Sequence, residues 1–165
     1  MYTYCIYCQT IRCNQIASCL QGEEFILDAI YPKIIQRQRK KKKNHEIESD
    51  FLPGYIFLYS ERDLIDSIIE ISKKYGVIRL LGNSDNNYAL IGEDYLFAIN
   101  LYKQNGVIGD VSLKKTHDKL MIYDPMFVQM NAEVSKIDYK KGRAKIEFDF
   151  AGRKCFTWVA VDIIN

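Results

Sequence analysis

The sequence lacks the usual signatures of an enzyme, a membrane protein or a secreted protein. It holds only two histidines, His45 and His117, and neither lies near a nucleophile motif. It contains no phosphate-cradling glycine loop, no H-E-x-x-H pattern and no G-x-S-x-G pattern. No apolar run approaches the roughly 20 residues that span a bilayer, and the start MYTYCIYC lacks the basic region and cleavage site of a signal peptide. We therefore expect a non-catalytic, soluble, cytoplasmic protein.

Cysteine is present in an odd number, five, and four of these residues crowd near the start of the chain: Cys5, Cys8, Cys13 and Cys19. Such crowding is compatible with a zinc or iron–sulfur site. The spacing argues against it, because Cys5 and Cys8 face opposite sides of a strand over residues 2–8. Cys13 instead falls on one apolar helical face with Ile16, Ala17 and Leu20. We expect buried thiols, no disulfide, no metal and no cofactor.

The net charge of +2 conceals an uneven distribution of basic residues. Residues 33–45 hold seven of the 23 basic residues and no acidic residue. Residues 114–165 hold ten basic against seven acidic residues, so the remainder holds six basic against 14 acidic residues. Positive charge concentrated in two places indicates a polyanionic partner.

The first 105 residues alternate between strand and helix patterns. Residues 2–8 read as a strand, and a helix of about ten residues follows and ends near Gly22. A strand over 28–38, with Pro32 at an edge or a bulge, leads into a hairpin tip with the sequence RQRKKKKNHE. The later segments predict a strand at FLPGYIFLY, a helix capped by Ser60 and Asp63 and ending at Gly76, a strand at 77–81, a polar turn at 83–87 and a helix at 93–104. This order predicts an α+β sandwich domain over 1–105.

The strand in FLPGYIFLY carries apolar residues on both of its faces. Successive side chains of a strand point opposite ways, so Tyr55, Phe57 and Tyr59 share one face while Ile56 and Leu58 share the other. One face can fill the core. The other face is covered by another element or forms a surface for a partner.

The pattern changes after residue 105. Residues 106–116 lack strong periodicity and are interpreted as a linker, and residues 117–165 contain short strand patterns only. These patterns cover 120–123, 132–137, 143–150 and 154–160, separated by turn signals. They predict a small, strongly bent all-β barrel of the SH3-like kind.

Two groups of basic residues are candidates for contact with nucleic-acid phosphates. The hairpin group comprises Arg37, Arg39, Lys40, Lys41, Lys42 and Lys43, and its alternative is a solvated loop. The C-terminal group comprises Lys136, Lys140, Lys141, Arg143, Arg153 and Lys154. Three aromatic residues beside the second group, Tyr139, Phe156 and Trp158, can stack on bases or fill the barrel.

Two segments in this order resemble the NusG transcription elongation factors. The succession that includes F-L-P-G-Y-I-F and G-V-I-R-L-L-G resembles their N-terminal (NGN) domain, and A-E-V-S-K-I-D-Y-K-K-G-R-A-K-I-E-F-D-F-A-G-R at 132–153 resembles their KOW domain. The resemblance implies an α+β NGN domain at 1–105, a linker at 106–116 and an SH3-like KOW barrel at 117–165.

The resemblance also implies a partner for the two-faced strand. In this family the aromatic face docks on the clamp helices of the RNA polymerase β′ subunit, which by position makes Tyr55 and Phe57 anchors, with Tyr7 alongside. The basic hairpin would lie toward the non-template DNA strand. A monomer bound in this way favours the processive state of the polymerase by differential binding, with no bond made or broken.

Departures from the family pattern indicate a specialised paralogue similar to the LoaP-type antiterminators. His117-Asp118 stands where Gly-Asp is usual, and Asn131 falls in a loop that customarily bears glycine, where Asn tolerates positive φ. Such a paralogue would read through terminators of particular operons, recruited by a DNA element or a structured RNA leader. The alternatives are a general elongation factor and a free-standing KOW-type RNA-binding module of the translation apparatus.

Overall fold

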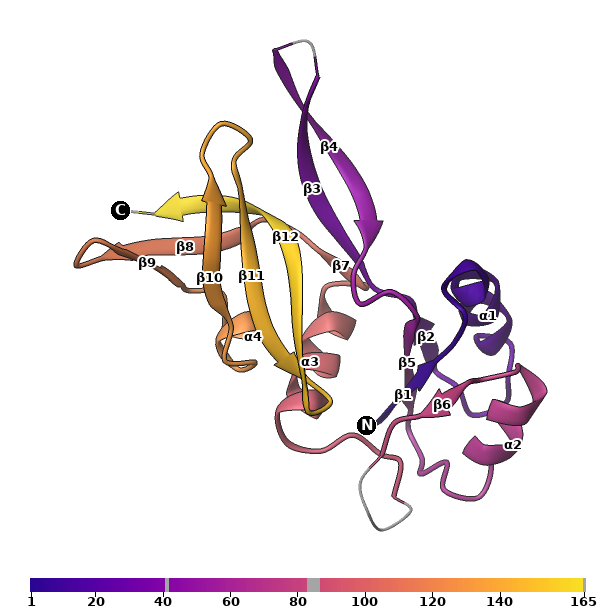
Figure 1. The fold of residues 1–165 in the computed structure, drawn as a ribbon. Coiled ribbons are helices and arrows are strands. Elements are labelled where there is room, and N and C mark those ends of the chain that lie inside the picture. The colour runs from indigo at the N-terminus through magenta and orange to yellow at the C-terminus, as the bar shows by residue number, and fades with distance from the viewer. Residues whose placement is uncertain (41, 83–86, 165) are drawn as a thin grey trace. The chain divides into compact units, whose positions relative to one another are not determined.

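The computed structural model describes residues 1–40, 42–82 and 87–164, and of residues 39, 40 and 44 it describes the backbone (Figure 1). The chain forms two compact units. The first unit comprises Met1–Pro32 and Leu52–Gly106, and the second comprises Lys33–Phe51 and Val107–Asn165. The basic hairpin therefore belongs to the same unit as the C-terminal strands, although its neighbours in sequence belong to the first unit.

The first unit is built on a four-stranded antiparallel sheet with the order β2-β5-β1-β6. Its strands are β1 (Tyr2–Tyr7), β2 (Asp28–Ile30), β5 (Tyr55–Ser60) and β6 (Arg79–Leu80). Its helices are the 3-10 turn η1 (Thr10–Arg12), α1 (Cys13–Leu20), α2 (Ile68–Lys74) and α3 (Gly92–Lys103). This α+β arrangement follows the predicted order of elements, and α1 buries the predicted face of Cys13, Ile16, Ala17 and Leu20.

Both faces of the central strand pair are buried. Tyr4, Ile6, Ile56 and Leu58 point into the core that α1 and α2 close. On the opposite face, Phe57 packs against Phe97 of α3, with ring centroids 5.6 Å apart. The Tyr59 hydroxyl donates a hydrogen bond of 2.7 Å to the carbonyl oxygen of Ala98 on the same helix. An intramolecular helix thus covers most of the second apolar face of this strand.

The second unit combines two sheets. A three-stranded sheet has the order β4-β3-β7, and a five-stranded sheet has the order β10-β11-β12-β8-β9. The strands are β3 (Lys33–Lys40), β4 (Lys43–Asp50), β7 (Val107–Ile108), β8 (Val111–Thr116), β9 (Lys119–Ile122), β10 (Glu133–Asp138), β11 (Arg143–Phe150) and β12 (Arg153–Ile164), with one short helix, α4 (Pro125–Val128). The C-terminal sheet curls so that its edge strands β9 and β10 contact each other, which is compatible with the predicted barrel.

Three predicted elements differ in the structure. The helix expected from Ser60 begins only at Ile68, because the Ser60 hydroxyl bonds to Arg62 and the Asp63 carboxylate accepts from the Ile65 amide in a local turn. The segment 106–116 contains β7 and β8, because β3 and β12 supply parallel hydrogen-bonding partners that local periodicity does not reveal. The predicted strand 28–38 is divided into β2 and β3 at Tyr31 and Pro32, since proline donates no ladder hydrogen bond.

The turns of the second unit contain several left-handed residues. Asn131 has φ of 51°, as predicted for a residue in place of glycine. His117 and Asp118, which form the turn between β8 and β9, have φ of 47° and 64°. The helix α4 was not predicted beyond a turn; Asp124 caps it by accepting a 3.0 Å hydrogen bond from the Met126 amide. The predicted turn at 83–87 lies outside the described residues except for Asn87.

No helix in the described parts of the chain is long and apolar enough to cross a bilayer.

Phe51 anchors the base of the β3–β4 hairpin in the core of the second unit. Its ring stacks on Phe148 of β11 at 5.4 Å and meets Phe127 of α4 edge-on at 6.1 Å. Phe127 and Phe148 lie 5.9 Å apart, so the three rings form one cluster, and Phe51 is 1% exposed. Burial of such a ring contributes several kcal/mol, so hairpin and C-terminal sheet share one core.

We expect Phe51→Ala to destabilise the second unit by about 3–5 kcal/mol, because it removes the ring that joins the hairpin to the C-terminal sheet. Urea unfolding followed by the fluorescence of Trp158, the single tryptophan, measures this loss. Phe156→Ala is the matched control, because Phe156 is 68% exposed and its loss is expected to cost less than about 1 kcal/mol. Equal losses for the two variants would contradict the shared core.

Candidate nucleic-acid and protein interfaces

Two tyrosines and an arginine lie at the end of the β1–β5 ladder. Tyr7 and Tyr55 are directly opposed in the antiparallel register, and their rings lie 4.9 Å apart at 53°. Arg79 of β6 pairs with Tyr7 on its other side and donates to the Tyr55 hydroxyl at 3.3 Å. The Arg79 guanidinium lies 5.9 Å from the centre of the Tyr7 ring, within range of a cation–π contact. We call Tyr7, Tyr55 and Arg79 the aromatic patch.

The aromatic patch is more accessible than the rest of its sheet face. Tyr7 and Tyr55 are half-buried and Arg79 is exposed, whereas Phe57 is completely buried beneath Phe97. Of the three residues predicted to contact a partner, Tyr7 and Tyr55 therefore reach the surface of the first unit, whereas Phe57, on the same face, is covered by α3. Arg79 was not singled out from the sequence, although it lies in the G-V-I-R-L-L-G segment.

Gly54 allows the ring of Tyr7 to lie against the chain. Its φ is 94°, and a Cβ atom at this position would lie 2.4 Å from Cε2 of Tyr7. Its carbonyl oxygen accepts a 2.8 Å hydrogen bond from the Cys8 amide, which ties the turn before β5 to the end of β1. The glycine of the P-G-Y motif is thus required both by the backbone conformation and by the neighbouring ring.

The basic hairpin residues differ in their surroundings. Lys42 and Lys43 are exposed, whereas Arg37 is half-buried midway along the ribbon, where it pairs with Glu46 in the register. The Arg37 guanidinium forms an ion pair with Asp110 and donates to the carbonyl oxygen of Val161 at 3.3 Å. Lys41 and the side chains of Arg39 and Lys40, also predicted to bind nucleic acid, lie outside the described residues and atoms.

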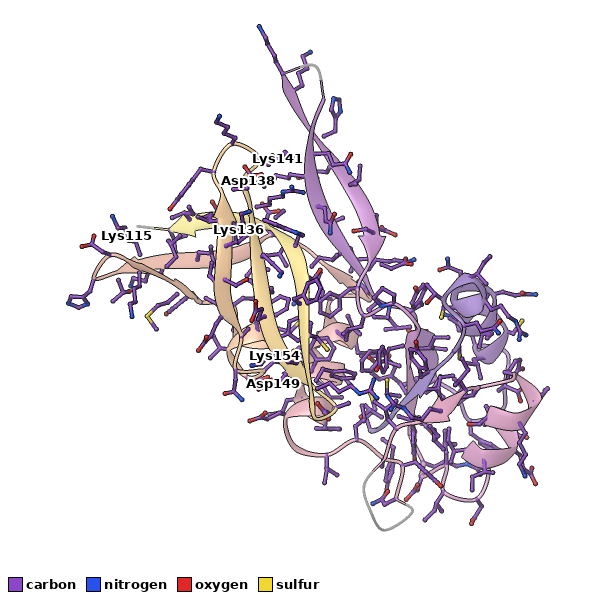
Figure 2. The ribbon with its side chains drawn as sticks, viewed as in Figure 1. Lys115, Lys136, Asp138, Lys141, Asp149 and Lys154 are labelled. Atoms are coloured by element: carbon purple, nitrogen blue, oxygen red, sulfur yellow. The ribbon has the colours of Figure 1, made fainter. Side chains whose placement is uncertain are left out.

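The predicted basic residues of the C-terminal sheet fall into two groups at opposite ends of β11 (Figure 2). Near the β10–β11 turn, Lys136 and Lys140 are exposed and Lys141 is half-buried. Arg143 lies there too, 3.5 Å from Asp138 and 4.5 Å from the centre of the Trp158 ring. At the other end Lys154 pairs with Asp149 at 3.1 Å, beside an exposed Arg153. Acidic neighbours partly neutralise two of the six residues.

The three aromatic residues beside the second basic group do not share one environment. Tyr139 is 70% exposed in the β10–β11 turn and Phe156 is 68% exposed on β12. Trp158 is half-buried, so it neither fills the core nor lies fully in solvent. Lys145, which the sequence did not single out, places its ammonium group 4.3 Å from the centre of the Phe156 ring. Lys145 falls on the outward face in the alternating pattern of β11, and this position was the sequence feature that could have indicated the contact.

The cysteines do not come together as a metal site in the described residues. Cys5 lies opposite Phe57 on the α3 face of the sheet, whereas Cys8 and Cys13 lie in the core beneath α1 and α2. Burial raises the pKa of Cys8 to about 11, so its thiol keeps its proton at neutral pH. Across residues 1–40, 42–82 and 87–164, no three His, Cys, Asp or Glu side chains are placed to hold a metal ion.

We expect Gly54→Ala to lower the free energy of unfolding of the first unit by more than Gly152→Ala lowers that of the second unit. Both glycines have positive φ, so alanine costs about 1–2 kcal/mol at either position. At Gly54 the added methyl group also displaces the Tyr7 ring, which costs about 1–3 kcal/mol more, whereas no atom lies within 4 Å of a Cβ at Gly152. Denaturant unfolding followed by circular dichroism measures both losses, and equal values would contradict this account of the motif.

Comparison with known protein families matches the first part of the chain. The model of the family described as transcription termination factor nusG matches residues 1–100, which cover the whole of β1 to β6 and most of α3. A search of curated proteins gives no match. Proteins of the matched family are non-catalytic factors that bind RNA polymerase. The match covers more than half of the chain and includes every residue of the aromatic patch, and on this basis the chain belongs to the NusG family.

Proposed function

We propose that this protein is a transcription elongation factor of the NusG family that promotes readthrough of terminators at particular operons. Family membership supports a role in transcription elongation and termination in general. The observation that supports docking on RNA polymerase is the aromatic patch, because tyrosine and arginine are residue types that dominate protein interfaces.

The proposed partner of the patch is the pair of clamp helices of the RNA polymerase β′ subunit. Tyr7 and Tyr55 offer flat apolar rings with hydroxyl groups at their edges, which suits a surface that is partly apolar and partly wet. Phe57 lies next along the same strand face and is covered by Phe97, so it is not proposed to touch the partner. A factor that binds the closed clamp better than the open clamp shifts the polymerase toward the elongating state.

The proposed role of the basic residues is to bind nucleic acid in the transcribing complex. Exposed lysines on the β3–β4 hairpin would contact the non-template DNA strand, and the C-terminal strands, proposed to be a KOW domain over 117–165, would contact a recruiting element. Lysine ammonium groups contact phosphates as point charges and carry no sequence information by themselves. Operon specificity would therefore come from the shape of a structured RNA leader.

Promoter-initiated transcription through a terminator tests this proposal. We expect the wild-type protein to increase readthrough only on a template that carries the native leader, and the Tyr7→Ala/Tyr55→Ala variant to lose that increase because its docking rings are gone. Phe57→Ala is avoided here, because Phe57 is fully buried and its loss would disturb the fold.

Tyr2→Ala is the matched control, because Tyr2 is an exposed tyrosine at the other end of β1 and should leave readthrough unchanged. Readthrough on every template, with or without the leader, would indicate a general elongation factor instead. No change in elongation or termination on any template would contradict the polymerase assignment and favour an RNA-binding module.

A further inference from the structure

The segment between α1 and β2 contains one residue in a strained backbone conformation. Phe25 has φ of 73°, in the left-handed region that bulky residues rarely adopt. Glycine reaches this region without the steric penalty, so the backbone alone would favour glycine at this position. Strain of this kind persists where the surrounding structure enforces it, and it gathers at ligand sites. A phenylalanine here therefore indicates that the ring itself has a role.

Contacts on both sides of this residue hold the segment in place. Before it, Glu23 forms an ion pair with Lys74 at the end of α2. After it, Ile26 is 7% exposed in the core of the first unit. The Leu27 amide then donates a 2.8 Å hydrogen bond to the carbonyl oxygen of Tyr59 on β5. The strained residue is thus presented on a fixed frame.

A cavity of about 370 Å³ lies beside this segment, a volume that suits a small molecule. It is lined by Phe25, Ile26, Leu27, Ser60, Glu61 and Arg62. Phe25 and Leu27 are 41% and 47% exposed, so two large apolar side chains border the open space. The opposite wall is fixed, because the buried Ser60 hydroxyl donates to the Arg62 carbonyl oxygen at 2.7 Å and accepts from the Arg62 amide at 3.2 Å.

Arg62 places a positive charge beside these apolar side chains. Its guanidinium lies over the ring of Phe25. Within residues 1–40, 42–82 and 87–164, this guanidinium forms no ion pair and donates no hydrogen bond. Stacking on a ring leaves the N–H donors free at the edge of the guanidinium, where two of them can bind one carboxylate. It also restrains the side chain, so less conformational freedom is lost when an anion binds.

We propose that this cavity binds a small monocarboxylic acid that carries an aromatic or branched aliphatic group. The apolar group packs against Phe25 and Leu27, and the carboxylate accepts hydrogen bonds from Arg62. Glu61 lines the same cavity and repels further negative charge, which favours one carboxylate over a dicarboxylate or a phosphate. The cavity adjoins Ser60, at the opposite end of the β1–β5 ladder from the aromatic patch, so the acid site does not rest on the proposed docking to polymerase.

The edge of the sheet favours a free acid over the end of a peptide chain. β2 is an edge strand, and an extended peptide commonly binds by adding a strand to such an edge. The amide of its middle residue, Ala29, donates to the Asp28 carboxylate at 2.8 Å, and the Ala29 carbonyl oxygen accepts from Gln21 at 3.2 Å. Because these backbone groups are engaged within the unit, β2 offers little to hold a peptide main chain.

Titration of the full chain with phenylpropionate, followed by nitrogen–proton correlation spectra, tests the site. We expect saturable binding with shifts of the Phe25, Leu27 and Arg62 amides. Phenylpropionamide and phenylpropylamine keep the ring without the negative charge, so they should bind at least about tenfold more weakly. A blocked tripeptide that ends in phenylalanine should also bind more weakly. The absence of a saturable shift, equal binding of the amide, or tighter binding of the tripeptide would overturn the proposal.

Two substitutions separate binding from stability. Phe25→Gly removes the ring but relieves the left-handed strain, so binding should fall at least about tenfold while the midpoint of urea unfolding changes little. Arg62→Gln changes an exposed side chain and should weaken phenylpropionate about tenfold but phenylpropionamide little. Arg153→Gln is the matched control, because Arg153 is equally classed as exposed and lies in the second unit. Wild-type affinity in either cavity variant would overturn the site, whatever the readthrough assay shows.

Discussion

The antiparallel ladder between β1 and β5 is the constraint on which the first unit depends. Apolar side chains leave this ladder on both faces, so α1 and α2 must cover one face and α3 the other. A slip of one residue would exchange the two faces and put Ile56 and Phe57 in each other's environments, which fixes the register strongly. Because the register is fixed, the last pair of the ladder, Tyr7 and Tyr55, has a defined place beside Arg79.

The same ladder explains why the aromatic patch lies where it does. α3 reaches Phe57 and Tyr59, so it covers the face from the middle of β5 to its end. The first residue of β5, Tyr55, is left half-buried together with its neighbour Tyr7. The position of the helix along the strand therefore decides which aromatic residues are structural and which are accessible, although all of them lie on one face.

The hairpin shows how one stretch of sequence serves both units. It is flanked in sequence by β2 and β5, yet its base pairs with β7 and its last residue, Phe51, packs on Phe127 and Phe148. The next residues form the turn that orients Gly54 against Tyr7. The first residue of the motif F-L-P-G-Y, Phe51, thus belongs to the core of the second unit. Its last residue, Tyr55, lies at the surface of the first unit.

Local patterns predicted the elements whose partners are close in sequence or whose burial is one-sided. The apolar face of α1 and the alternation of β11 are confirmed, because helical and strand periods are visible in single segments. The strand β7 was missed because its partner β3 lies far away in the chain. The strand β8 has a distant partner, β12, besides its neighbour β9, and its own residues show no strong alternation. The burial of Phe57 and the engagement of Arg37 depend on Phe97 and Asp110, and no local pattern identifies such distant partners.

The most direct test of the account is a photocrosslink from the aromatic patch to RNA polymerase. A photoreactive phenylalanine analogue at position 55, in place of Tyr55, would be irradiated in a complex with the cognate polymerase and the adduct mapped by mass spectrometry. The account predicts an adduct with the clamp helices of the β′ subunit, and none when the analogue replaces Tyr2. An adduct only from position 2, or none with polymerase from either position, would contradict the proposed docking of this patch.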